Sequence, residues 1–154
     1  MAQTLLVSLL LLLAGCATPQ TQDRAAAAKA LFEQAVTFHQ QRQFSEAAAG
    51  YERLLKTYRD QPFWCAQALR SLGNVRAAQG KLDEAVKLYR QVGEKYPQQD
   101  WEVLQAWKSA GDLLWDAGRK DEARQFYHLI VERFDKPDMP AVFQTIVRAA
   151  AAKL

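Results

Sequence analysis

The sequence is poor in the residue types on which most active sites depend. Its 154 residues include two cysteines, two histidines and seven scattered glycines. Neither His39 nor His128 has a second ligand or base at the spacing of a metal site or a catalytic triad. A glycine-rich phosphate loop is also missing. The sequence therefore predicts no catalytic residues, no metal site and no cofactor, and a protein that is not an enzyme.

Charge of one sign is not concentrated anywhere in the chain. Twenty basic and 17 acidic residues give a net charge of +3, and the two signs are interspersed. Nucleic-acid-binding domains usually gather lysine and arginine on one stripe. The charge pattern therefore predicts that nucleic acid is not a partner.

Long apolar runs are limited to one, close to the first residue. The ten residues Leu5–Ala14 are apolar except for Ser8. Ten residues of helix span about 15 Å, roughly half of the hydrocarbon core of a bilayer. The run is too short for a stable transmembrane helix and is typical of the apolar region of a signal peptide.

The apolar run ends in a cysteine motif, Leu13-Ala14-Gly15-Cys16. It resembles the lipobox of bacterial lipoproteins, which implies cleavage before Cys16 and acylation of the cysteine sulfur and amino group. We therefore expect a signal peptide over residues 1–15 and a lipidated, flexible tether over residues 16–23. The residue after the cysteine is Ala17, whereas aspartate at that position would signal retention of the lipoprotein in the inner membrane. The resemblance therefore implies the periplasmic face of the bacterial outer membrane.

The remainder of the chain repeats itself with an offset of 38 residues. Segments beginning at Phe44, Leu82 and Lys120 align without gaps, and each carries Glu-Ala followed by tyrosine four positions after the alanine. The same offset links a series of small residues and a series of aromatic ones: Ala35, Gly73 and Gly111, and Tyr58, Tyr96 and Phe134. Apolar residues at helical spacing predict two helices in each unit. Residues 142–154 continue the offset as a lone helix, which a helical repeat needs as a cap.

The pattern resembles the tetratricopeptide repeat, in which a small residue, an alanine and an aromatic residue mark the packing of two antiparallel helices. The second unit matches best, with Gly73, Ala85, Tyr89 and Pro97. The resemblance implies an all-α fold, a right-handed α-solenoid of three helical hairpins plus a C-terminal capping helix. It is expected to cover residues 24–154, with repeats at about 28–61, 66–99 and 104–137 and the cap at 142–154.

In tetratricopeptide domains the first helix of each hairpin lines a concave groove. The matching positions imply a peptide groove formed by five residues of units two and three: Arg70, Asn74, Lys108, Asp112 and Trp115. Arginine and lysine can hold acidic groups, asparagine can hydrogen-bond a peptide backbone, and tryptophan offers apolar area for an anchor. Each could equally be an ordinary solvated residue on a helix face, and Trp115 could be packed in the core.

The lipobox and the repeats together suggest a binding function. The expectation is a lipid-anchored periplasmic adaptor that holds a protein or peptide partner near the membrane during envelope assembly or secretion. The alternative is a structural or self-associating envelope protein whose repeat faces stack on like subunits. Aromatic residues between the repeats, at Phe63, Trp64 and Trp101, could serve such stacking.

Overall fold

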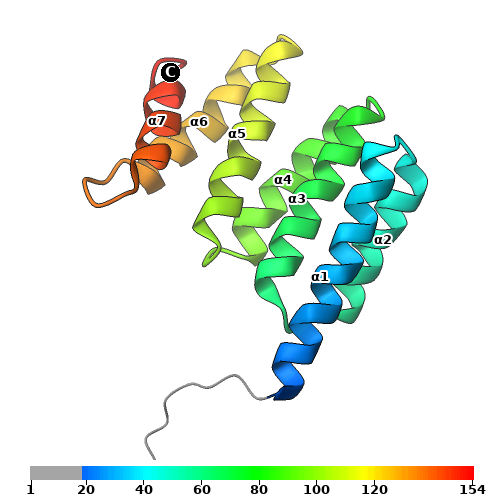
Figure 1. Ribbon diagram of the computed structural model, residues 1–154. Coiled ribbons are helices and arrows are strands. Elements are labelled where there is room, and N and C mark those ends of the chain that lie inside the picture. The colour runs from blue at the N-terminus through cyan, green and yellow to red at the C-terminus, as the bar shows by residue number, and fades with distance from the viewer. Residues whose placement is uncertain (1–18) are drawn as a thin grey trace, which may run out of the picture.

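Helices account for most of the described chain. The computed structural model describes residues 19–154. Seven helices lie within that range: α1 (Pro19–Gln40), α2 (Phe44–Thr57), α3 (Pro62–Ala78), α4 (Leu82–Lys95), α5 (Asp100–Asp116), α6 (Lys120–Phe134) and α7 (Ala141–Ala151). Figure 1 shows three antiparallel hairpins stacked in chain order and followed by α7. The predicted all-α solenoid of three hairpins and a capping helix is confirmed.

The turn inside each hairpin places a left-handed backbone residue at the same repeat position. The φ angle is 61° at Arg42, 75° at Gly80 and 77° at Gly118, and the three positions are 38 residues apart (80 − 42 and 118 − 80). Glycine adopts this conformation without steric cost, whereas another residue loses about 1 kcal/mol or more. The turn is therefore favoured by sequence in units two and three, and the surrounding packing must impose it on arginine in unit one.

The repeated small and aromatic positions pack against each other within each hairpin. The tyrosines of the second helices are buried in all three units: Tyr51, Tyr89 and Tyr127. A Cβ atom added to Gly73 would lie 2.6 Å from Cε1 of Tyr89, and one added to Gly111 would lie 2.6 Å from Cε1 of Tyr127. Only a residue without a side chain lets the ring approach the helix backbone so closely.

The first helices of neighbouring hairpins contact each other through the same pair of repeat positions, but the side chains at these positions differ. Between α1 and α3, the ring centroids of Phe32 and Trp64 are 5.7 Å apart. Between α3 and α5, Nε of Arg70 donates a hydrogen bond of 2.6 Å to Oε2 of Glu102. Both pairs join residues 32 positions apart (64 − 32 and 102 − 70). The first joint is therefore an aromatic contact and the second an ion pair.

Helix α7 covers the apolar end of the third hairpin. Its buried residues are Phe143, Val147 and Ala150, and the ring of Phe143 lies 5.6 Å from those of Trp101 and Phe134. The helix runs from 141 to 151, so the last three residues of the predicted cap lie outside it. Without α7, the apolar face of the third hairpin would be exposed to water.

Helix α1 begins earlier than the sequence suggested. Residues 19–23, expected to belong to a flexible tether, form its first turns. Proline is well tolerated in the first turn of a helix, where its missing N–H costs nothing. The other first helices also begin earlier, at Pro62 and Asp100, four residues before the expected unit starts at 66 and 104. The predicted signal peptide, residues 1–15, and Cys16 lie outside the described residues.

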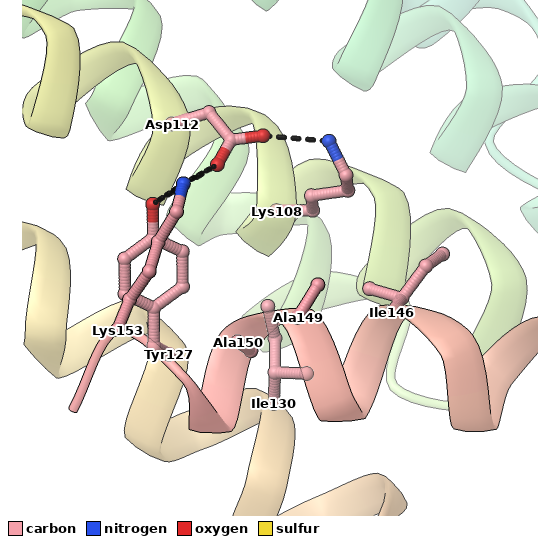
Figure 2. A pocket seen from close by; sticks show the side chains of 8 residues that line it. All are labelled: Lys108, Asp112, Tyr127, Ile130, Ile146, Ala149, Ala150 and Lys153. Atoms are coloured by element: carbon pink, nitrogen blue, oxygen red, sulfur yellow. Dashed lines mark hydrogen bonds and ion pairs between the residues drawn. The ribbon is translucent and has the colours of Figure 1, made fainter.

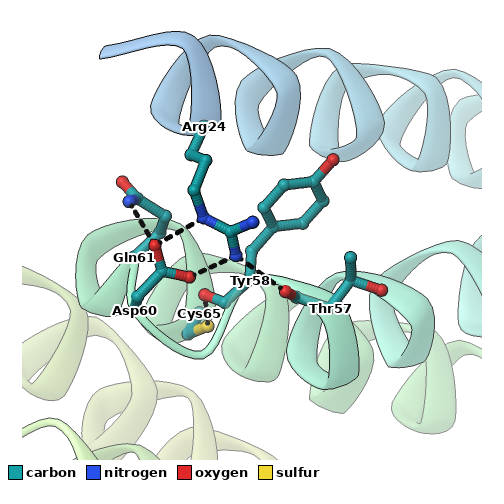
Figure 3. A network of polar contacts seen from close by, with 6 residues as sticks. All are labelled: Arg24, Thr57, Tyr58, Asp60, Gln61 and Cys65. Atoms are coloured by element: carbon teal, nitrogen blue, oxygen red, sulfur yellow. Dashed lines mark hydrogen bonds and ion pairs between the residues drawn. The ribbon is translucent and has the colours of Figure 1, made fainter. Parts of the chain in front are cut away.

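A polar network fixes the first turns of α1 to the loop between α2 and α3 (Figure 3). The Arg24 guanidinium donates to both carboxylate oxygens of Asp60, at 2.7 and 2.6 Å, and to the carbonyl oxygen of Thr57 at 3.1 Å. It also lies 5.3 Å from the ring centroid of Tyr58. The hydrogen bonds from Arg24 hold the pKa of Asp60 well below its ordinary value.

No helix within residues 19–154 is long and apolar enough to cross a membrane.

Candidate functional site: the inner face of the first helices

Arg70 lies on α3 and is engaged by another residue of the chain. Its partner Glu102 lies on α5 and is 3% exposed, while the Arg70 side chain is 24% exposed. A carboxylate buried to this extent requires a nearby cation. Arg70 therefore joins α3 to α5, and an acidic ligand would have to compete with Glu102 for its guanidinium. Its role in a groove stays a prediction.

Asn74 lies one turn further along α3 and contacts the tyrosine of its own hairpin. Its Oδ1 accepts a hydrogen bond of 2.7 Å from the hydroxyl of Tyr89. Burial raises the pKa of Tyr89 to about 12, so the hydroxyl keeps its proton and donates. Because Oδ1 faces Tyr89, the amide Nδ2 of Asn74 is the atom that a peptide carbonyl would meet.

Asp112 occupies the equivalent position on α5 and is the centre of a larger polar cluster (Figure 2). Its Oδ2 accepts from Nζ of Lys108 at 2.6 Å, and its Oδ1 accepts from the Tyr127 hydroxyl and from Nζ of Lys153, both at 2.9 Å. Burial alone would raise the pKa of Asp112, but the hydrogen bonds from Lys108, Lys153 and Tyr127 outweigh it and lower the pKa. The cluster therefore holds one carboxylate against two ammonium groups.

The same cluster borders a pocket between α5, α6 and α7. The pocket has a volume of about 120 Å³, and its apolar lining is Ile130, Ile146, Ala149 and Ala150. The polar side chains of the Asp112 cluster form the rest of the lining, as Figure 2 shows. Pockets for drug-sized molecules are several times larger. This one is sized for a single side chain of a longer ligand.

Trp115 lies on α5 beside the pocket and is neither fully buried nor fully exposed. Three cationic groups lie within 6.0 Å of its ring: Nζ of Lys120 at 5.2 Å, Nζ of Lys153 at 5.3 Å and Cζ of Arg124 at 6.0 Å. The ring of Tyr127 is 6.0 Å away. Cations held beside an aromatic ring can attract an anionic group of a ligand, while the ring supplies apolar area. The surroundings of Trp115 therefore suit a ligand that is both acidic and apolar.

Several residues that form or border this site were not predicted as site residues, among them Glu102, Ile146 and Lys153. The repeat itself contained the signal for two of them. An offset of 38 places Ile146 in register with Lys108, and Lys153 in register with Trp115 (146 − 108 and 153 − 115). Glu102 gave no such signal, because its equivalents are Trp64 and Pro140.

The remaining reactive side chains do not assemble into a centre of their own. Within residues 19–154, no group of three histidine, cysteine, aspartate or glutamate residues could hold a metal ion. The Cys65 thiol is buried and donates to the carbonyl oxygen of Tyr58 at 3.1 Å. Burial raises its pKa, whereas a reactive cysteine needs a lowered one. His39 packs 5.9 Å from the ring of Phe44.

The fold and the inner face define a tetratricopeptide-like helical repeat protein, and comparisons with known proteins agree. Residues 34–100 match the model of the tetratricopeptide repeat family. Among solved structures, the chain resembles the type III secretion chaperone SycD of Yersinia enterocolitica in complex with a peptide of the translocator YopD. The TM-score is 0.59 at 19% sequence identity, and the match covers 83% of this chain and 95% of the chaperone chain. The search of curated proteins gave no match.

Proposed function

We propose that this chain is a lipid-anchored periplasmic adaptor whose inner face binds a peptide segment of a protein partner in cell-envelope assembly or secretion. The observation that carries the proposal is the pocket between α5, α6 and α7, where apolar side chains and the Asp112 cluster meet beside Trp115. A repeat protein of similar fold, the secretion chaperone, was solved in complex with a peptide. That complex supports a peptide as the class of ligand.

The chemistry of the pocket indicates how a peptide would be held. The Lys108 side chain is 43% exposed and the Lys153 side chain 34% exposed, so both ammonium groups are accessible to a ligand. A carboxylate of the peptide would share these lysines with Asp112 through charge-assisted hydrogen bonds. A neighbouring apolar side chain would enter the pocket against Ile146 or lie on the ring of Trp115. The ligand is therefore a segment in which an acidic residue adjoins an apolar one.

The lipid anchor is the second part of the proposal. It is supported by the motif Leu13-Ala14-Gly15-Cys16, which follows an apolar run of signal-peptide length. Two or more acyl chains on Cys16 would give stable attachment, since one chain is only marginal. We place the anchored protein on the periplasmic face of the bacterial outer membrane.

The test of the groove is a comparison of two double variants in whole cells. One variant combines Lys108→Ala with Trp115→Ala on the inner face. The control combines Lys87→Ala with Glu84→Ala, both exposed on α4. Loss of an interface anchor costs about 2 kcal/mol or more, which is roughly a 30-fold loss of affinity. We expect partner crosslinking to fall by at least tenfold for the first variant and to stay unchanged for the control.

Two results would contradict the proposal. Equal crosslinking yields from the two variants would show that the inner face is not the binding surface. Concentration-dependent assembly of the natural protein in sedimentation, removed by substitutions at a repeat face, would support the self-associating alternative instead. Arg70 is left out of the test because its removal would strand the buried carboxylate of Glu102.

A further inference from the structure

Large apolar side chains are exposed mainly along one edge of the solenoid. Four such residues are exposed in the described chain: Phe63 (46%), Trp101 (42%), Val142 (50%) and Leu154 (44%). The first three are each the second residue of a helix, α3, α5 and α7 respectively. These helices begin on the side of the molecule where α1 also begins, as Figure 1 shows. We call this side the loop edge, defined by Phe63, Trp101 and Val142.

The aromatic residues of the loop edge are held in place rather than loose. Phe63 lies 5.0 Å from the ring of Trp64 in an edge-to-face contact, and Trp101 lies 5.6 Å from Phe143. Each ring therefore rests on a neighbouring ring of the fold while keeping more than two fifths of its surface in water. Ordering these side chains against a partner would cost little conformational entropy.

Charges near the loop edge are largely neutralised within the protein. Arg24 pairs with Asp60 at 2.6 Å, and Arg133 pairs with Asp100 at 2.7 Å. Other exposed charges include Arg59 next to Asp60, and Lys136 flanked in the sequence by Asp135 and Asp138. The edge thus carries charges of both signs beside its apolar side chains, without a net basic patch. A surface of this kind fits the interfacial region of a bilayer through its aromatic groups and not through attraction to anionic lipid.

The position of the expected lipid anchor selects the occupant of this edge. Two residues separate Cys16 from Pro19, so three Cα–Cα steps limit their Cα distance to about 10 Å. From Pro19 to Arg24, α1 rises by roughly 8 Å, and Arg24 is bound to Asp60, three residues before Phe63. The acylated residue is therefore held within about 20 Å of the Cα atom of Arg24, on the side of the molecule where Phe63 lies.

We infer that the loop edge is a membrane-docking surface, and that Phe63, Trp101 and Val142 contact the phospholipid headgroup region when Cys16 is anchored. The inference rests on the lipid anchor proposed above. Docking along this edge points the N-terminal ends of α1, α3 and α5 toward the membrane. It also keeps the pocket beside α7 at a fixed height above the surface.

Fluorescence quenching by lipid tests this inference on the acylated full-length product purified from bacterial membranes. The protein is placed in phosphatidylethanolamine and phosphatidylglycerol vesicles whose acyl chains are either brominated or plain. We expect brominated lipid to lower the tryptophan emission, and the variant Trp101→Phe to lose that decrease. Raised salt should leave the quenching unchanged, because the edge carries no net basic patch.

The matched control moves the probe to the opposite end of α7. The variant Trp101→Phe with Leu154→Trp exposes one tryptophan away from the loop edge, and its emission should be equal in the two kinds of vesicle. Equal emission of the natural, acylated protein in brominated and plain vesicles would overturn the docking surface while leaving the anchor intact. Absence of the diacylglycerol mass on Cys16 would overturn the anchor, and the docking surface with it.

Discussion

The ion pair between Arg70 and Glu102 should be the most sensitive contact between the second and third hairpins. Glu102 is 3% exposed and its recorded partner is Nε of Arg70 at 2.6 Å. Replacing Arg70 by methionine keeps a long, helix-favouring side chain but removes the cation. Breaking a buried pair from one side costs about 3–5 kcal/mol, because the remaining charge stays buried. At about 2–4 °C per kcal/mol, the Tm of Arg70→Met should fall by roughly 10 °C.

A double-mutant cycle separates the cost of a stranded charge from the value of the pair. Adding Glu102→Leu to Arg70→Met removes the stranded carboxylate, and apolar replacement of a whole buried pair is often neutral or stabilising. We expect the double variant to unfold in urea within about 1 kcal/mol of the natural protein, with a coupling energy of about 2 kcal/mol or more. A loss below about 1 kcal/mol in the single variant, without coupling, would refute the reasoning.

Two further predictions concern the packing and the charge of the hairpins. Gly73→Ala should lower the free energy of unfolding by about 1–3 kcal/mol, because its Cβ would lie 2.6 Å from Tyr89. Helix propensity alone predicts a gain of about 1 kcal/mol, so a more stable variant in urea unfolding would contradict the clash. The lowered pKa of Asp112 stabilises the fold above its unfolded value near 4 and ceases to do so as the pH falls through the folded pKa. Asp112→Asn should therefore flatten the loss of stability below about pH 4, measured as Tm against pH.

The hairpins could be predicted from the sequence because their packing depends on residue size at fixed spacing. Gly73 and Gly111 are small where a tyrosine ring crosses the helix, and the 38-residue offset makes that requirement visible twice. The turn at Arg42 was less visible, since its left-handed backbone has no glycine to mark it. The start of α1 was missed because residues 19–23 are polar and include a proline. Their helix is fixed by Arg24, whose partner Asp60 is 36 residues away.

The contacts of the candidate site residues could not be predicted from the sequence, because their partners come from different repeats. Residue type at one position indicates what a side chain can bind, but not which neighbour already occupies it. Arg70 and Lys108 share a register, yet Arg70 pairs with Glu102 of the next hairpin, whereas Lys108 pairs with Asp112 on its own helix. A period of 38 cannot distinguish the two cases. The difference depends on residues 102 and 140, where one repeat has glutamate and the next has proline.

Variation along the register indicates how a partner segment would lie on the inner face. The position that holds Arg70 in α3 is Phe32 in α1, Lys108 in α5 and Ile146 in α7. Phe32 and Ile146 are partly buried apolar side chains, while the two positions between them are cationic. A segment that crossed the first helices would therefore meet an apolar contact at each end and charge in the middle. Both cations are paired, but the Lys108 side chain is 43% exposed and that of Arg70 only 24% exposed. Lys108 is therefore the central cation that such a segment would reach, and an acidic residue near its middle is the feature that would identify it.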